Sequence, residues 1–320
     1  MASGSISANI TSLAASTTYY YRAFVSEYNE TTSSYEYRYG SVRSFTTTGS
    51  GGAPATPGWL ELPAVTGTED YFGWFYGSGG NVGTNRNYSY NYSYTWYASL
   101  WVAYPLCGTH KSGSASTSSW HFNPDIDEDL QVDITSNSYG TMYNAGSYAR
   151  GHQCPNGSRK SDGTMNYQTY YATNQTPQLQ NKFNGSIWSA LENAVRGLVS
   201  SASDTVYVVT GPAYRKAGGS EGITYLSGAS ASANPASLPV PNYYWKAILK
   251  VKRSAGVITD AMAIGFWLDH RNYDNSNYAA YAVSVNQIET WTGFDLFANL
   301  PVALQATAEA NESWGDFQDF

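Results

Sequence analysis

The sequence predicts an α+β fold in which a largely antiparallel sheet packs against helices. Two different hydrophobic periods lead to this prediction. Residues 205–210 (TVYVVT) form a short apolar run typical of a buried strand, and apolar residues alternate with lysines along 243–252, as in a half-exposed strand. Residues 257–267 predict a third strand. Residues 179–199 instead repeat apolar side chains at the 3.6-residue period of a helix.

Weaker patterns supply the remaining elements. Three further strands are expected where aromatic and β-branched residues gather: 86–89, 94–104 and 170–173. Residues 108–147 are expected to be mostly loop. Ser284 and Gln287 match a capping box that opens a short helix through Trp291. The tail, 303–320, is expected to be mildly helical.

The composition bounds the class of protein. With 320 residues, 42% of them hydrophobic and 16% aromatic, the chain can bury a substantial core and is long enough for two domains. It has no run of 18 apolar residues, so no membrane span is expected. Only 13% of the residues are charged, while Ser, Thr, Asn, Gly and Tyr are abundant. We therefore expect a secreted or cell-surface protein whose export signal is absent from this chain.

The chain divides into three parts by composition. We expect an N-terminal β segment, a Gly- and Pro-rich linker and a large second domain: 1–48, 49–58 and 59–320. Leu13, Thr17 and Tyr19 resemble the L-x-P-x-T-x-Y corner of a fibronectin type III module, with strands at 19–28 and 39–47. Such a module needs about seven strands, so this all-β segment is partial. The alternative is a generic Tyr- and Thr-rich hairpin resting on the second domain.

Most of the residues suited to catalysis lie in 148–196. His152 stands in the tripeptide Arg-Gly-His, and a polar loop with two cations follows it. On the predicted helix, Glu192 and Arg196 are spaced by four, which favours an ion pair. Considered alone, that spacing is more typical of a solvated helix face with one weak ion pair.

The order of these residues resembles the DNA/RNA non-specific endonuclease family, whose catalytic core is the ββα-metal, or His-Me, finger. The residues that stand in the family's order, with one extra residue between Asn174 and Asn184, are Arg150, Gly151, His152, Asn174, Pro177, Gln178, Asn184, Trp188, Leu191, Glu192 and Arg196. The resemblance covers about 58–320. It implies a ββα-metal nuclease fold for the second domain and a bacterial nuclease that acts on DNA and RNA.

The resemblance implies a general base and a metal ligand. His152 would take a proton from the attacking water, because a neutral imidazole can do so near pH 7. Asn184 would be the direct protein ligand of a hydrated Mg²⁺, which Mn²⁺ is expected to be able to replace. One amide oxygen suffices, since Mg²⁺ keeps several waters and binds substrate phosphate. Glu192 would hold the waters of the metal.

The resemblance also implies groups that bind the phosphate. Arg150 and Arg196 would brace its developing negative charge, a task suited to a forked, permanently charged donor. Asn174 would be counted with the catalytic set as a residue that positions the base. Arg159 and Lys160, in the loop after the histidine, are expected to bind substrate. These cations would form a local basic cleft on a chain whose net charge is −7.

Two positions depart from the family's pattern. Ala149 stands where the family usually has an acidic residue, and the run SASTSS before Trp120 lacks the arginine that commonly precedes this tryptophan. The second departure removes part of the expected phosphate clamp. An alternative is therefore a weakened, nuclease-like surface protein that binds nucleic acid or glycan without cleaving it. A phosphodiesterase for small nucleotides is a third hypothesis.

The remaining cysteines and histidines are expected to be structural. Cys107 and Cys154 are the only cysteines, and the sequence leaves open whether they pair or stay free. His110 and His270 have no evident catalytic partners, and His121 is expected to be exposed in a loop.

Overall fold

The computed structural model describes residues 18–29, 34–39, 41–46, 57–78, 85–134, 138–140 and 147–320. The chain divides into two compact units, residues 1–57 and 58–320. Leu13 and Thr17 of the predicted fibronectin corner, and nearly all of the predicted linker, lie outside the described residues. Within the described ranges, no helix is both long and apolar enough to cross a membrane.

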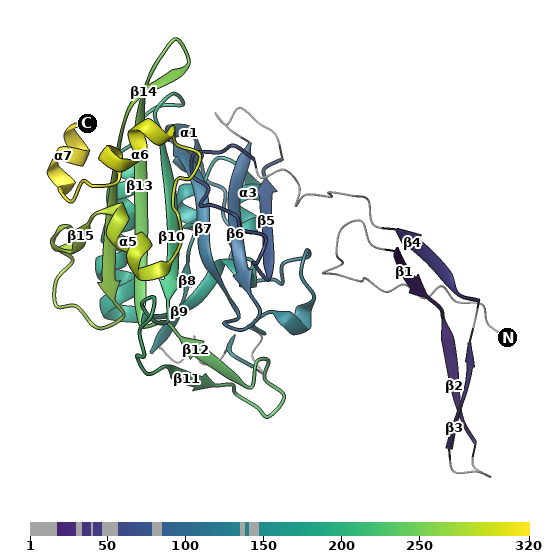
Figure 1. Ribbon diagram of the computed structural model, residues 1–320. Helices are drawn as coiled ribbons and strands as arrows, with labels where there is room; N and C mark the ends of the chain where they lie inside the picture. The colour runs from purple at the N-terminus through teal and green to yellow at the C-terminus, as the bar shows by residue number, and fades with distance from the viewer. Residues whose placement is uncertain are drawn as a thin grey trace. The chain divides into compact units, whose positions relative to one another are not determined.

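The first unit contains two antiparallel strand pairs. β1 (Thr18–Tyr21) pairs with β4 (Arg43–Thr46), and β2 (Phe24–Asn29) pairs with β3 (Ser34–Tyr39), as Figure 1 shows. Large apolar side chains on β2 and β3 remain exposed: Phe24, Val25, Tyr28 and Tyr35. The strand predicted at 19–28 is divided between β1 and β2, the one predicted at 39–47 is confirmed at β4, and β3 was not predicted. The fibronectin identity stays a prediction.

The second unit is built on one seven-stranded sheet. Its strand order is β15-β14-β13-β10-β7-β6-β5, and every neighbouring pair is antiparallel. The strands are β5 (Tyr71–Tyr76), β6 (Arg86–Ser93), β7 (Ala98–Cys107), β10 (Thr205–Ala213), β13 (Tyr243–Ser254), β14 (Val257–Asp269) and β15 (Ala282–Val283). The predicted antiparallel sheet is confirmed, and it includes β5, in a segment for which the sequence predicted only loops and one short strand.

Smaller elements surround this sheet. Two more antiparallel pairs join β8 (Tyr148–His152) to β9 (Gln175–Leu179) and β11 (Thr224–Ser227) to β12 (Ser237–Val240). The helices are α1 (Gly108–Lys111), α3 (Gly163–Gln168), α4 (Ser189–Gly197), α5 (Val285–Thr292), α6 (Val302–Ala308) and α7 (Trp314–Asp319). Short 3₁₀ turns occupy η1 (Glu128–Leu130), η2 (Asn156–Ser158), η3 (Ala172–Asn174) and η5 (Tyr278–Tyr281).

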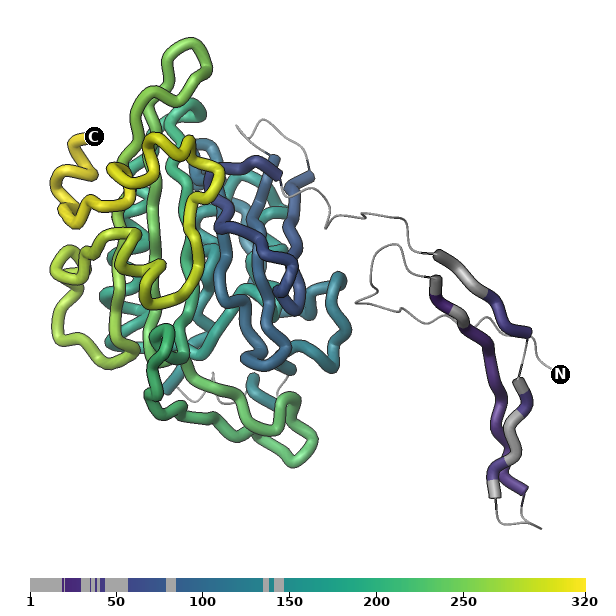
Figure 2. The backbone as a smooth tube through the Cα atoms, in the orientation of Figure 1, coloured from purple at the N-terminus to yellow at the C-terminus, as the bar shows by residue number. Residues whose placement is uncertain are grey.

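The sheet buries both faces, because strand side chains alternate between them. On β13, Tyr244 and Ile248 pack against the helix that contains α4, whereas Trp245 and Ala247 pack on the side of α5. We call these the α4 face and the α5 face. Figure 2 shows the yellow C-terminal segment in front of the sheet and teal segments behind it. The result is a layered core in which residues 244–249 of β13 are buried on both faces of the sheet.

The long predicted helix is confirmed, but its winding changes along its length. Residues Gln180–Trp188 form a π-helix, η4, which continues without a break into α4. The helix after Ser284 is also confirmed, and Gly293 ends it in a left-handed conformation with φ 78°. The predicted capping box is wrong in one detail, since the Ser284 side chain makes no cap hydrogen bond.

The strand predicted at 170–173 is wrong. Tyr171 forms only an isolated parallel bridge with His121, and the chain then turns through η3 before β9 begins at Gln175. Two buried main-chain bonds hold this segment, one between the Tyr170 carbonyl and the His121 N–H and one between the His121 carbonyl and the Ala172 N–H. Tertiary pairing therefore overrides the local β-propensity of the Tyr/Thr run.

Arg159 is a structural residue, and the prediction that it binds substrate is wrong. Its side chain is fully buried. The guanidinium donates to the carbonyl oxygens of Asn87, Pro105 and Ser158 at 2.7, 3.0 and 2.8 Å, and to Asn87 Oδ1 at 2.7 Å. These bonds join the loop after β8 to β6 and β7. A guanidinium held in this way cannot reach a nucleic acid in solvent.

His270 fastens β9 to the end of the large sheet. Its Nε2 accepts a hydrogen bond from the Leu179 N–H at 2.8 Å, and its Nδ1 lies 2.8 Å from the Pro241 carbonyl. Both bonds are satisfied when Nδ1 carries the single proton of a neutral ring. Burial lowers the pKa of His270 to about 4. The expected structural role of this histidine is confirmed.

Replacing Arg159 should destabilise the protein without a specific loss of substrate binding. Arg159→Met leaves three buried carbonyl oxygens without their donor, and we expect the free energy of unfolding to fall by about 3–5 kcal/mol. Urea unfolding measures this change, with exposed Arg215→Met as the control. Unchanged stability combined with weaker nucleic-acid binding would contradict the structural role.

Acid should destabilise the fold partly through His270. Because the folded-state pKa is about 4 and the ordinary value is 6.5, the unfolded chain binds the proton first as the pH falls. The stability is complete above pH 6.5 and is lost towards pH 4, by about 3 kcal/mol. Thermal unfolding at pH 7 and pH 4.5 should show a smaller acid loss in His270→Gln than in the wild type. Equal losses in the two proteins would show that His270 does not carry this dependence.

Candidate active site

Strands β8 and β9 fix the position of His152. The two strands pair with His152 opposite Gln175 and Gly151 opposite Thr176. A Cβ at Gly151 would collide with the Gln178 side chain, which crosses this strand. A larger residue than glycine in the Arg-Gly-His tripeptide would therefore force the buried Gln178 side chain to move.

Asn174 clamps the chain just after His152. Its Oδ1 accepts from the Cys154 N–H at 2.9 Å, and its Nδ2 donates to the carbonyls of Cys154 and Thr169 at 3.0 and 2.7 Å. The side chain is fully buried, so all of its bonding capacity serves the main chain. These bonds fit the predicted role of Asn174 as a residue that positions the base, which stays a prediction.

The His152 imidazole lies between two aromatic rings. The centroids of Trp120 and Tyr170 lie 4.7 and 4.8 Å from that of His152, and Asn156 Nδ2 donates to the Tyr170 hydroxyl at 2.6 Å. The His152 Nε2 is buried and has no hydrogen-bond partner within the described part of the chain. A buried ring nitrogen without a protein partner is a group that a small molecule such as water would have to satisfy.

Two cations share the surroundings of His152. Burial, and then the charges of Arg150 and Lys160, lower the pKa of His152 to about 3. The Arg150 Cζ lies 5.6 Å from the Trp120 ring centroid, and the Lys160 Nζ donates to the Ala115 carbonyl at 3.1 Å. With Arg159 buried elsewhere, Lys160 is the loop cation that remains beside the histidine. Its predicted substrate role stays a prediction.

The helix supplies the other predicted residues. Asn184 lies half-buried in the π-helix, which contacts β8, and no protein hydrogen bond engages its amide among the described residues. One turn into α4, Glu192 Oε2 lies 3.9 Å from Arg196 Nη1. The Arg196 guanidinium lies beside Gly157, in the turn that follows His152. The structure thus packs the helix against the histidine segment.

Sequence reasoning missed one charged residue beneath this helix. The alternation of lysines along β13 predicted that Lys246 faces solvent, but the side chain is fully buried on the α4 face. Burial raises the pKa of Glu192, while Lys246 and then Arg196 oppose that rise. The signal lay in the neighbours of Lys246, since an apolar run such as YYWKAIL is typical of a strand covered on both faces.

The residues present fit a hydrated magnesium ion better than an ion held by a protein cage. Among the described residues, no three His, Cys, Asp or Glu side chains gather to hold a metal. The candidates are an amide and a carboxylate on one helix, Asn184 and Glu192. Oxygen ligands in small number are the donor set expected for Mg²⁺, which retains much of its water.

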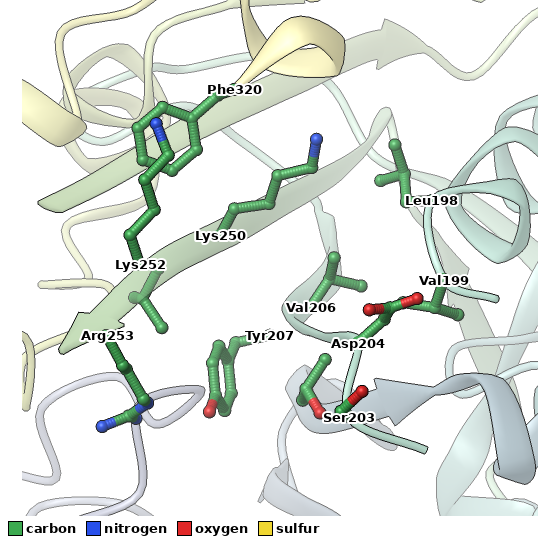
Figure 3. A pocket seen from close by; sticks show the side chains of 12 residues that line it. Leu198, Val199, Ser203, Asp204, Val206, Tyr207, Lys250, Lys252, Arg253 and Phe320 are labelled. Carbon is green, nitrogen blue, oxygen red and sulfur yellow. The ribbon is translucent and has the colours of Figure 1, made fainter. Parts of the chain in front are cut away.

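Other features lie apart from these residues or prove structural. Figure 3 shows a pocket of about 470 Å³ between β10, β13 and the C-terminal residue Phe320, and none of its 12 lining residues is a predicted site residue. Cys107 and Cys154 are both buried and unpaired. His110 accepts from the Cys107 N–H, as a structural histidine should. The His121 ring is stacked on the Tyr167 ring, with the two ring centroids 3.9 Å apart. His121 is therefore not the exposed loop residue that was expected.

The chain is similar to several known nucleases. The chain is 29% identical over 238 residues to a nuclease of Serratia marcescens, covering 73% of this chain and 82% of the relative. It is 26% identical over 219 residues to a nuclease of Nostoc sp., covering 66% and 70%. A chain in the crystal structure of the EndoG/EndoGI complex has the same fold, with a TM-score of 0.55 and 22% identity over 67% of this chain and 84% of that one.

The sequence profile of the DNA/RNA non-specific endonucleases matches residues 74–303. This range includes the paired strands β8 and β9 and the helix formed by η4 and α4. With a match over more than half of its length, the chain belongs to the DNA/RNA non-specific endonuclease family of hydrolytic nucleases.

Proposed function

We propose that this protein is a Mg²⁺-dependent, sugar-non-specific endonuclease in which His152 is the general base. The observation that carries this proposal is the open Nε2 of His152, buried between Trp120 and Tyr170 and next to a helix with an available amide and carboxylate. Membership of the family supports the nuclease class. The roles of the individual residues are inferred from their surroundings.

The proposed reaction is hydrolysis of a phosphodiester bond by an activated water. The low pKa keeps His152 neutral across the physiological range, so the ring is ready to accept the proton of that water. Arg150 and Arg196 contribute forked donors for the phosphate oxygens. Asn184 and Glu192 would hold Mg²⁺, which supplies charge neutralisation at the phosphate and at the leaving oxygen.

A base with so low a pKa is weak until substrate arrives. The charges of Arg150 and Lys160 are part of the cause, and a bound phosphate would offset both of them. The same phosphate would therefore raise the pKa of His152 towards its ordinary value. In this proposal the substrate strengthens its own general base, which couples binding to proton transfer.

The overall charge of the protein affects how it would bind nucleic acid. The net charge of −7 opposes long-range attraction, so binding depends on the few cations near His152. Fewer cations are available near His152 than the sequence predicted, because Arg159 is buried. Such a site favours turnover over tight retention.

One observation favours a second candidate function. The arginine expected before Trp120 is absent, and Arg159 cannot replace it because its guanidinium is tied to main-chain carbonyls. A site that lacks part of its phosphate clamp could bind nucleic acid or glycan without cleaving it.

Digestion of supercoiled plasmid and of total RNA tests the proposal. We expect the wild type to cleave both with Mg²⁺ or Mn²⁺, and not with EDTA. His152→Ala should reduce the rate by about 10²–10⁴-fold, because the general base is lost. His121→Phe keeps an aromatic ring against Tyr167 and serves as the matched control. A wild type that retains nucleic acid on a gel yet leaves both substrates intact would favour the binding function.

Removing the charge of Lys160 should change both binding and pH dependence. In Lys160→Met one cation near His152 is lost, so the pKa of His152 rises and the acidic limb of kcat/KM moves to higher pH. KM should rise about fivefold, since one screened phosphate contact contributes about 1 kcal/mol. Lys182→Met is the control. An unchanged pH profile would place Lys160 outside the active site.

A further inference from the structure

The Trp120 ring lies against two residues of the candidate active site at once. Its centroid is 4.7 Å from that of the His152 ring, and the Arg150 Cζ lies over the indole at 5.6 Å from its centroid. Tyr170 completes the group, with its ring centroid 5.0 Å from that of Trp120 and 4.8 Å from that of His152. One uncharged side chain therefore contacts both the proposed base and a proposed phosphate-binding cation.

The main chain next to Trp120 is fixed by hydrogen bonds to the segment that carries Tyr170. The His121 N–H donates to the Tyr170 carbonyl at 3.1 Å, and the His121 carbonyl accepts from the Ala172 N–H at 2.8 Å. Both bonds involve the residue that follows Trp120. The position of the Trp120 backbone relative to Tyr170 is therefore set by main-chain pairing, before any side-chain contact is counted.

An apolar cluster supports the indole. Leu226 of β11, together with Leu238 and Val240 of β12, belongs to a buried cluster against which the partly buried Trp120 packs. These residues follow Trp120 by more than 100 positions in the chain. Close packing of this kind restricts a side chain to few rotamers. The β11–β12 hairpin thus holds in place a ring that contacts His152 and Arg150.

Contact with a ring face suits an arginine that is to bind phosphate. A guanidinium carries its five N–H donors in one plane. A carboxylate partner would occupy two of these donors, whereas a cation–π contact attracts the charge and occupies none. Among the aromatic side chains, the indole of tryptophan gives the strongest attraction of this kind. Trp120 can thus orient Arg150 without using the donors that a phosphate requires.

The same ring restricts the imidazole of His152. A general base must present its nitrogen within hydrogen-bond reach of the attacking water. The His152 ring is tilted by 41° to that of Trp120 and by 83° to that of Tyr170, so a large rotation of the imidazole would bring it into collision with one of them. A misplacement of about 1 Å can lower a rate about 100-fold. A ring that fixes the base therefore affects the rate without taking part in proton transfer.

We propose that Trp120 is a positioning residue of the nuclease site, which holds the Arg150 guanidinium over its indole and fixes the orientation of the His152 imidazole. This inference rests on the proposed function, because it takes His152 as the base and Arg150 as a phosphate donor. It adds to that function an uncharged residue that acts through two others.

Substitution of the indole tests this proposal. Trp120→Leu removes the ring, and we expect kcat to fall about 10–100-fold on both plasmid DNA and RNA, because the catalytic groups are misplaced. Trp120→Phe keeps an aromatic face and should restore kcat to within about fivefold of the wild type.

Trp96→Leu is the matched control. Trp96 is also partly buried and stacks on another ring, that of Tyr214, with the centroids 4.2 Å apart. Its substitution should leave kcat within about twofold, since it alters neither His152 nor Arg150. Equal losses of stability and of activity in the two leucine variants would make Trp120 structural.

A double-mutant cycle isolates the part of the effect that acts through Arg150. In an Arg150→Met background, Trp120→Leu should lower kcat at least about threefold less than it does in the wild type, because no guanidinium remains to be held. Equal losses in the two backgrounds would overturn the proposal, and so would full activity of Trp120→Leu. A wild type without metal-dependent cleavage would instead refute the proposed function.

NMR measurements without turnover test the positioning itself. The order parameter of the Arg150 Nε–H should be high in the wild type and fall below about 0.6 in Trp120→Leu. The His152 ring protons should also shift, because they lose the ring current of the indole. An Arg150 side chain that is equally ordered in both proteins would refute the proposal, whatever the protein cleaves. If Trp120→Leu does not fold, the same comparison is made with Trp120→Phe, in which a smaller loss of order is expected.

Discussion

The fixed placement of His152 depends above all on the main-chain clamp made by Asn174. One amide side chain joins the peptide groups of Cys154 to the end of α3 through three hydrogen bonds. Because the side chain is fully buried, breaking these bonds would leave unsatisfied polar groups in the core. The hairpin β8–β9, the aromatic rings around the imidazole and the loop that contains Arg159 all take their positions from this junction.

Buried polar groups recur throughout the layer that carries the site. Arg159 joins that layer to β6 and β7, and His270 joins it to the end of the large sheet. Each uses a charged or titratable side chain to satisfy main-chain carbonyls or N–H groups that β pairing leaves open. The segment that carries His152 is therefore held by polar interactions, and a shift of one residue in register would break them. Such ties favour one geometry more strongly than apolar packing does.

The sequence predicted the antiparallel sheet of the second unit and the helices that pack on it well, whereas the catalytic roles stay predictions. The patterns at 205–210, 243–252 and 257–267 correspond to the strands β10, β13 and β14, because each run lies within the sheet and buries apolar side chains. The prediction failed where a long-range contact decides the structure. The Tyr/Thr run at 170–173 became a turn because it pairs with the segment around His121.

Charged residues show the same limit. Arg159 and Lys246 read as solvent-facing in the sequence, since lysine and arginine are rarely buried. Only the tertiary structure shows that Arg159 donates to the carbonyls of Asn87 and Pro105. It also shows that the Lys246 ammonium lies over the Trp188 ring. The order of residues in the motif suggested the roles proposed for His152, Asn184 and Glu192. Only the folded structure shows which residues surround them.

The π-helix has a consequence for how this site tolerates insertions and deletions. A π-turn holds one more residue in each hydrogen-bonded ring than an α-turn does, so an added residue can be taken up inside the helix. The π-helical winding covers Gln180–Trp188, a stretch that includes Asn184 and ends four residues before Glu192. The segment can thus alter the angular phase between Asn184 and Glu192 while α4 and its packing stay in place. Changes of chain length here would rotate Asn184 about the helix axis relative to Glu192.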